Sequence, residues 1–276
     1  MTDIATRNKQ HFDKDASTHL ADWAELIQAI IDEFRARREW ISDSWADSDA
    51  VKRQGLEFRL LDYACGSGTV SKVSGYLFMA RNLDEIFSTT QLVFIKLTEY
   101  LQALLPFVTQ AVGLDISPGM VSEYNKWAQE TGSSSDRVWA YEYDMLAGEE
   151  RNPLPRQDLS NFDIVVVSMA LHHVSDPAKL MQRLGQCLRP GGTCVILDRT
   201  PASTKANTDA TTSKRLGDTL KTVNKEGFAE EEMQKLYEDA GMGQNFEYVV
   251  IPRPFEARVF GRELSITGFI ARGELA

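Results

Sequence analysis

The segment LEFRLLDYACGSGT, residues 56–69, constrains the fold most, because an apolar run passes directly into a glycine-rich turn. Glycine has no Cβ and adopts positive φ readily, so such a turn lets the backbone approach a ligand closely. Similar apolar runs follow at AVGLDIS, RVWAYEYD, FDIVVVSMA and TCVILD, with helical patterns between most of them. Strands that alternate with helices predict an α/β fold with a doubly wound, mostly parallel sheet.

The two ends of the chain complete the predicted architecture. QNFEYVVI and ELSITGFIARG predict two closing strands, which makes the sheet seven-stranded. Apolar residues from Leu20 to Phe34 recur at helical spacing and predict amphipathic amino-terminal helices. We therefore expect a single domain over residues 1–276, in which residues 1–55 form a helical cap. The polar stretch from Arg199 to Lys225 is expected to be a loop over the site.

Polar side chains follow four of the predicted strands where ligands bind in such sheets, beyond the carboxyl ends of the strands. Asp62 precedes the glycine turn, and Asp115 and Asp144 end the second and third strands. An acid at the end of the second strand can accept hydrogen bonds from ribose hydroxyls. Ser168, His172 and His173 follow the fourth strand.

The blocks LLDYACGSGT, AVGLDISPGM, DIVVVSMALHHVSDP and LRPGGTCVILD occur in the order found in one family. On these blocks the chain resembles the class I S-adenosylmethionine-dependent methyltransferases, and within them the small-molecule, quinone-biosynthesis-like branch. The resemblance implies a Rossmann-like methyltransferase fold and S-adenosylmethionine as cofactor. It also implies that the chain is an enzyme, which transfers a methyl group to an oxygen, nitrogen or carbon atom of a small molecule.

The resemblance also assigns roles to particular residues. It implies that Asp62, Ala64, Gly66, Gly68, Asp115, Ile116, Met120, Asp144, Met145 and Ser168 bind the cofactor. His172 and His173 are the candidates for a catalytic base, which is needed only when the acceptor must lose a proton; a structural role is the alternative. The segment from His11 to Ala16 is expected either to close over the cofactor or to be a solvated leader.

The distance from the glycine turn to the acid of the second strand departs from the usual pattern. That distance is ~20 residues in comparable folds, yet Gly68 and Asp115 are separated by an additional segment, residues 73–102. Removing it restores helical spacing between Val70 and Val108. Val73-Ser74 can be encoded by GTAAGT and Gln102 by CAG, the consensus ends of an intron.

Two interpretations of residues 73–102 follow, a translated unspliced intron or a genuine helical insertion, and the sequence of the spliced transcript decides between them. An insertion at this place leaves a further alternative, in which the chain is an inactive or cofactor-binding scaffold protein. An NAD-dependent dehydrogenase is less favoured, because the turn lacks the third glycine of a dinucleotide site.

Composition excludes several other partners. The net charge of −10 opposes a nucleic-acid surface and makes an RNA or protein methyltransferase the weaker alternative. The longest apolar runs are shorter than the ~20 residues of a membrane span, so we expect no membrane partner and a cytoplasmic location, with the nucleus as the alternative. Cys65, Cys187 and Cys194 lack metal-ligand spacing and predict reduced thiols with no metal.

The acceptor itself is not identified by the sequence, and neither is the oligomeric state. We expect the acceptor pocket to be formed by the amino-terminal helices, the Arg199–Lys225 loop and the segment from Phe255 to Phe260. Trp23 is expected to pack in the core rather than to line that pocket.

Overall fold

The computed structural model describes residues 3–42, 57–70, 108–148, 150, 152–155, 158–204 and 214–276. Its helices are α1 (Ile4–Asp22), α2 (Ala24–Ala36), α3 (Arg38–Ile41), α7 (Pro118–Glu130), the 3-10 helix η5 (Leu171–His173), α8 (Pro177–Cys187), α9 (Lys214–Leu220) and α10 (Glu230–Asp239). Its strands are β1 (Arg59–Tyr63), β2 (Gln110–Asp115), β3 (Val138–Glu142), β4 (Phe162–Ser168), β5 (Leu188–Thr204), β6 (Gln244–Val250), β7 (Phe255–Val259) and β8 (Arg262–Glu274). Residues 73–102, the additional segment, lie outside this part of the chain.

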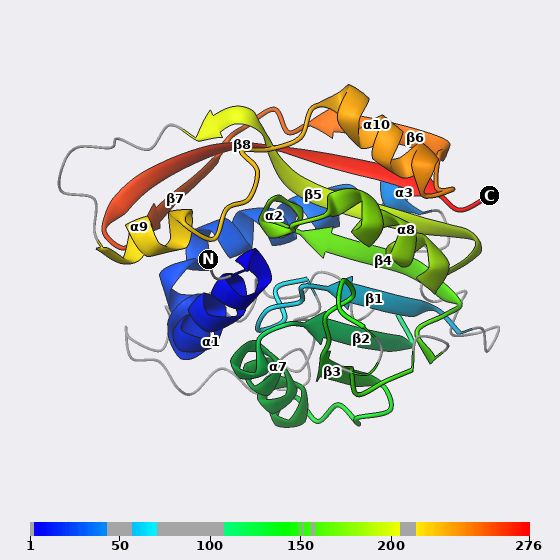
Figure 1. Cartoon of the computed structure of the whole chain (residues 1–276), viewed down its shortest axis with the longest axis horizontal. Helices are drawn as coiled ribbons and strands as arrows, with labels where there is room; N and C mark the ends of the chain where they lie inside the picture. Colours follow the sequence, from blue (N-terminus) through cyan, green and yellow to red (C-terminus); the bar gives the residue numbers. More distant parts are fainter. Residues whose placement is uncertain are drawn as a thin grey trace, which may run out of the picture.

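The strands form one sheet in the order β3-β2-β1-β4-β5-β8-β6 (Figure 1). The first five of these are parallel, whereas β8 runs antiparallel to both β5 and β6. The predicted doubly wound, mostly parallel seven-stranded sheet is therefore confirmed. In addition, β7 pairs with β8 as an eighth strand that the sequence pattern did not predict. The strand order reverses between β1 and β4, where such sheets bind their ligands.

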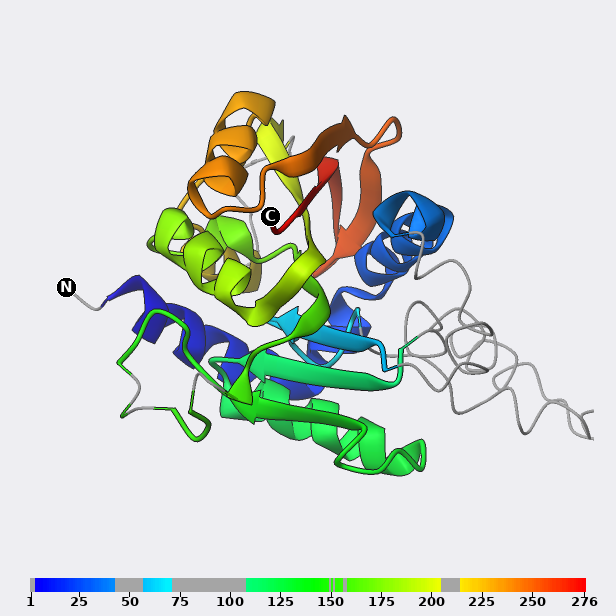
Figure 2. The ribbon, with the colours of Figure 1, turned by 90° about the vertical axis from the view of Figure 1, so that its right-hand side faces the viewer.

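Both faces of the sheet are covered, which is why its strands are continuously apolar. Leu60 packs into a core with α2 and α7, whereas its neighbour Leu61 packs into a second core with α8 and α10. On β4, Val166 packs into the first core and its neighbour Val165 packs into the second. Figure 2 shows α2 on the opposite side of the sheet from α8 and α10. The two cores hold β1 and β4 rigidly, so their carboxyl ends are fixed in position.

Helix α1 is docked onto the beginning of α7. The Oδ1 atom of Asp13 accepts hydrogen bonds from the Gly119 backbone N–H at 2.6 Å and from the Ser117 hydroxyl at 3.2 Å. A Cβ at Gly119 would lie 2.8 Å from Asp13 Oδ1 and 3.1 Å from the Cβ of Ala16, so the close approach requires glycine. The arrows of β1, β2 and β4 point toward α1, which lies across the open end of the sheet (Figure 1).

The structure shows the form of two polar segments. The segment from His11 to Ala16 is part of α1, and its Phe12 lines the cavity, so it is not a solvated leader, and closure over the cofactor stays a prediction. The stretch from Arg199 to Lys225 is only partly a loop, because β5 continues to Thr204 and α9 occupies Lys214–Leu220. Few residues of these helices are buried, so no apolar stripe marked them in the sequence.

The contact of Asp13 with α7 should stabilise the fold. We expect Asp13→Asn to lower the free energy of unfolding by about 1 kcal/mol, because a carboxylate at a helix N-terminus accepts from backbone N–H groups and favours the helix dipole. Glu123→Gln, a loss of charge within α7 itself, is the matched control. Denaturant titration of both variants checks this, and equal midpoints would contradict the role given to Asp13.

Candidate functional site

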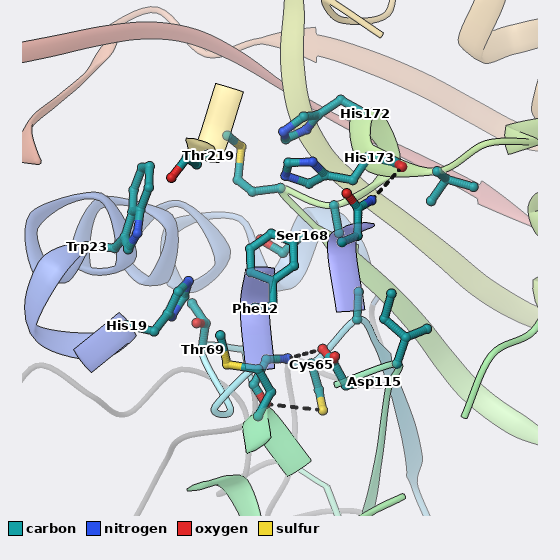
Figure 3. Close-up of a pocket in the computed structure, with 18 of the residues that line it drawn as sticks. Phe12, His19, Trp23, Cys65, Thr69, Asp115, Ser168, His172, His173 and Thr219 are labelled. Atoms are coloured by element: carbon teal, nitrogen blue, oxygen red, sulfur yellow. Dashed lines mark hydrogen bonds between the residues drawn. The ribbon is translucent and has the colours of Figure 1, made fainter. Parts of the chain in front are cut away.

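A cavity of about 240 Å³ opens at the carboxyl ends of the parallel strands, beneath α1 and α2. The predicted site residues that line it are Asp62, Ala64, Gly66, Asp115, Ile116, Met120, Asp144, Ser168, His172 and His173. They come from segments far apart in the sequence, and the fold brings them together. Figure 3 shows Asp115 and Cys65 at one end of the view, the two histidines at the other, and Phe12 and Ser168 between.

Gly68 and Met145 do not line the cavity. The backbone N–H of Gly68 donates to the carbonyl of Cys65 at 2.9 Å, and its φ of 99° requires glycine, so this residue shapes the turn. Met145 is buried in the same core cluster as Leu61. These two residues therefore affect a ligand indirectly, by holding in place the neighbouring residues that line the cavity.

The glycine turn leaves backbone exposed to the cavity. Gly66 has a φ of 54°, and a Cβ built on it would meet nothing within 4 Å. The Ala64 residue also has positive φ, 55°, which is uncommon for a residue with a side chain. The N–H of Cys65 donates to the Leu114 carbonyl at 3.1 Å and joins the turn to β2. The turn is thus fixed in a shape that a ligand can approach closely.

Asp115 ends β2 and connects two turns. Its Oδ2 accepts from the N–H of Gly66 at 2.9 Å, and its Oδ1 accepts from the N–H of Ser117 at 2.8 Å. The side chain is 8% exposed, and burial raises its pKa to about 6, although the hydrogen bonds from Ser117 and Gly66 oppose this shift. Each carboxylate oxygen has a further lone pair, which ligand hydroxyls can use.

The other strand-end residues add two acids and a hydroxyl. Asp62, at 1% exposure, is buried near the end of β1. Asp144 follows β3 and is positioned by the N–H of Leu146, which donates to its Oδ1 at 2.8 Å. The Oγ of Ser168 is buried and makes no hydrogen bond to any residue that the structure describes. An unsatisfied buried hydroxyl is costly, so Ser168 is a good candidate to contact a ligand.

His172 is held by a buried carboxylate that was not among the predicted site residues. Its Nδ1 lies 2.7 Å from the Oδ1 of Asp198, and its backbone N–H donates to the Oδ2 of the same residue at 3.2 Å. A carboxylate accepts the Nδ1 proton, so Nε2 is the ring nitrogen left for a ligand. Asp198 lies on β5, beside the end of β4, and the rule that singled out Asp62 and Asp115 could have found it.

His173 is neutral and is fixed in one tautomer. Its Nδ1 lies 2.9 Å from the carbonyl oxygen of Thr222, which can only accept, so Nδ1 carries the proton. Burial lowers the pKa of His173 well below its usual value, and the neighbouring His172 adds to this. The two imidazoles lie with ring centroids 4.0 Å apart. The site therefore presents two imidazoles that are both oriented through Nδ1.

Helix α1 supplies site residues, of which Phe12 lies in the segment expected to close over the cofactor, whereas Asn8 was not identified from the sequence. Asn8 donates through Nδ2 to the backbone carbonyl of His173 at 3.0 Å. The ring of Phe12 meets that of His173 edge to face, with centroids 5.4 Å apart. Trp23, between α1 and α2, packs against the core as expected and also lines the cavity. A polar, weakly amphipathic segment such as α1 gives no sequence signal for these contacts.

This arrangement is that of a Rossmann-like protein, with its cavity at the point where the strand order reverses, which is where such sheets bind nucleotide-type cofactors. The chain belongs to the methyltransferase-domain family, whose model matches residues 18–247.

Two curated relatives are themselves uncharacterized methyltransferases. The chain is 29% identical over 149 residues to one from Schizosaccharomyces pombe, and 28% identical over 96 residues to one from Bacillus subtilis. These alignments cover 53% and 35% of the chain. They span only 40% and 34% of the respective relatives.

Two solved structures share the fold with the chain at low sequence identity. The magnesium protoporphyrin IX methyltransferase of Synechocystis, solved with bound S-adenosylhomocysteine, matches 99% of the chain and 100% of its own, with a TM-score of 0.51 and 14% identity. A methyltransferase of Thermotoga maritima, described as a possible histamine N-methyltransferase, matches 97% of the chain and 99% of its own with the same score and identity. At such identity the likeness concerns the fold.

The position of Asp115 predicts a pH dependence for ligands that carry a ribose. We expect adenosine and S-adenosylhomocysteine to bind about tenfold or more weakly at about pH 5 than at about pH 7.5, because a hydrogen bond to a charged group is worth roughly 1.5–3 kcal/mol. The carboxylate takes up its proton as the pH falls through about 6.

Protonation of Asp115 is expected to lower the ligand affinity but not the stability of the fold. Asp115 has a higher pKa in the folded chain than its ordinary value of 3.8, so its protonation between about pH 7 and pH 4 stabilises the fold. Calorimetric titration across this range measures the affinity. An affinity for adenosine that is constant through pH 6, with the protein still folded, would contradict this role of Asp115.

Proposed function

We propose that the protein transfers a methyl group from S-adenosylmethionine to a small molecule. The observation that carries the proposal is the gathering of three acids and the Ser168 hydroxyl from the ends of β1 to β4 around one cavity and one glycine turn. The residues fit such a cofactor, because Gly66 faces open space and the Ser168 hydroxyl is buried without a partner among the described residues.

Each part of the site has a proposed role toward the cofactor. Asp62 would face the ammonium group of its methionine part, and Asp115 would accept from its ribose hydroxyls. Asp144 would accept from the adenine amino group, while Ile116 and Met120 pack beside the adenine ring. Bound S-adenosylmethionine supplies a methyl group on positively charged sulfur, so positioning of the acceptor provides much of the catalysis.

The enclosure of the cavity favours a small acceptor. Helices α1 and α2 cover the open end of the sheet, and Phe12 and Trp23 close the space above the strand ends. A nucleic-acid strand needs an open, positively charged groove, whereas this chain has a net charge of −10. No helix in the described ranges is long and apolar enough to cross a membrane. We therefore keep a small molecule as the acceptor, and the quinone-type branch remains one proposal for it.

Cofactor binding tests the proposal directly. We expect the full chain to bind S-adenosylhomocysteine in a calorimetric titration. We expect Asp115→Asn to weaken that binding by about tenfold or more, because only one of the two side-chain atoms of asparagine can accept hydrogen bonds from backbone N–H groups and ribose hydroxyls. Glu130→Gln, at the exposed far end of α7, is the matched control and should bind like the unmodified chain.

Binding alone does not distinguish an enzyme from a scaffold that only holds the cofactor. Transfer of labelled methyl from S-adenosylmethionine to molecules of a cell extract makes that distinction. Absence of binding in the folded chain would contradict the proposed function, whereas binding without transfer would favour the scaffold.

A further inference from the structure

The cavity extends beyond the strand-end acids into a second half with apolar walls. This half, termed the acceptor half, is lined by Trp23, Leu26 and Ile30 from the start and body of α2, by Leu216 and Leu220 of α9, and by Ile266 of β8. The expected segment from Phe255 to Phe260 contributes no lining residue, because β8 takes its place. The walls of this half therefore come from α2 and the residue before it, from α9 and from β8.

Leu220 marks the rim of the acceptor half. Leu220 is 41% exposed. Among the described residues, the other large apolar side chain that is exposed is Val250 on β6. Leu26, Ile30 and Leu216 are at most 5% exposed, so they form the buried part of the wall. Leu220 therefore lies where the apolar lining of the cavity meets solvent.

The acceptor half has no acidic residue in its described lining, and His19, beside Trp23, is a basic residue of this half. The acids in the cavity lining are Asp62, Asp115 and Asp144. All three lie at the ends of strands, in the other half of the cavity, which is the half proposed to bind the cofactor. Arg199 also lines the cavity, but its guanidinium donates to the Lys225 carbonyl at 2.9 Å and interacts with the carboxylates of Asp198 and Glu226. An ammonium group here would lose its hydration without a paired carboxylate, and a carboxylate would lose its hydration among side chains that are mostly apolar; both changes are unfavourable.

The polar groups next to the apolar walls suit a single hydroxyl. His172 and His173 line the cavity, and each uses Nδ1 for a fixed partner, the Asp198 carboxylate and the Thr222 carbonyl respectively. Each Nε2 can therefore accept a hydrogen bond. His172 is the candidate to take the proton, because its Nδ1 is held by the Asp198 carboxylate in the arrangement of a histidine–carboxylate pair.

We propose that the methyl acceptor is an uncharged, largely hydrocarbon molecule with one weakly acidic hydroxyl group, such as a phenol. Its hydrocarbon part would lie between α2, α9 and β8, and its hydroxyl would face His172. The hydroxyl proton passes to Nε2 of His172, and the oxygen electron pair forms the bond to the methyl carbon as the carbon–sulfur pair remains on sulfur. This inference rests on the proposed function, whose cofactor is the methyl donor.

Three probes of similar shape and different charge test the acceptor class. We expect para-hexylphenol to bind the full chain at least tenfold more tightly than para-hexylbenzoate and para-hexylbenzylamine, measured by calorimetry at neutral pH with and without S-adenosylhomocysteine. Leu220→Asn should weaken phenol binding by about fivefold to tenfold, because it removes part of the apolar wall. Val250→Asn is the matched control, since Val250 is 49% exposed, against 41% for Leu220, but lies outside the cavity.

The outcomes separate the acceptor class from the proposed function. If S-adenosylhomocysteine binds but the benzoate or the benzylamine binds as tightly as the phenol, the acceptor class is wrong and the function stands. If none of the three probes binds, the acceptor class is also wrong. If S-adenosylhomocysteine fails to bind, the proposed function is contradicted, whatever the phenol does.

The role of His172 has its own test. We expect His172→Gln to lower kcat for methylation of the phenol about a hundredfold, as for the loss of a general base. Its KM for the phenol and its affinity for S-adenosylhomocysteine should change less than about twofold, and retained cofactor binding shows that the variant is folded. A raised KM with unchanged kcat would contradict proton transfer and assign His172 to acceptor binding alone.

Discussion

The carboxylate of Asp115 is the interaction on which the rest of the site depends. It joins the glycine turn after β1 to the turn before α7, through the N–H groups of Gly66 and Ser117. The Ser117 hydroxyl in turn accepts from the Met120 N–H and donates to Asp13 of α1. A continuous series of hydrogen bonds thus runs from the turn to the helix that covers the cavity. The position of α1 over the strand ends is therefore coupled to the shape of the turn below it.

The carboxylate of Asp115 is buried, and burial disfavours its charged form. Burial raises the pKa of Asp115 to about 6 even though two backbone N–H groups donate to it. Groups with perturbed pKa values are common at functional sites, since a ligand can supply the interactions that the protein alone does not. The buried Ser168 hydroxyl and the burial-lowered pKa of His173 belong to the same pattern. The cavity is polar at one end for this reason, and apolar where α2, α9 and β8 enclose it.

Much of the fold could be predicted from the sequence, because strands buried on both faces are continuously apolar and their last residues identify the ligand edge of the sheet. Asp62, Asp115 and Asp144 were found in this way. The amino-terminal helices were expected as a cap, but the docking of α1 onto α7 was not, since the buried residues of α1 are Asn8 and Ala16 and the docking depends on polar contacts such as that of Asp13. Asp198 ends the predicted strand TCVILD and could have been found by the same rule, but its pairing with His172 is visible only in the fold. Strand β7 was missed because it is short and follows a proline-containing turn.

Hydrogen–deuterium exchange with and without S-adenosylhomocysteine tests the central claim most directly, because it reports the turn, the acids and α1 in one experiment. The account predicts slower amide exchange in the glycine turn, at the end of β2 and along α1, with α10 and β6 unchanged as internal controls. Protection in the turn without any change in α1 would contradict the coupling between them. Exchange that is unaffected at both places would contradict a cofactor site at the ends of these strands.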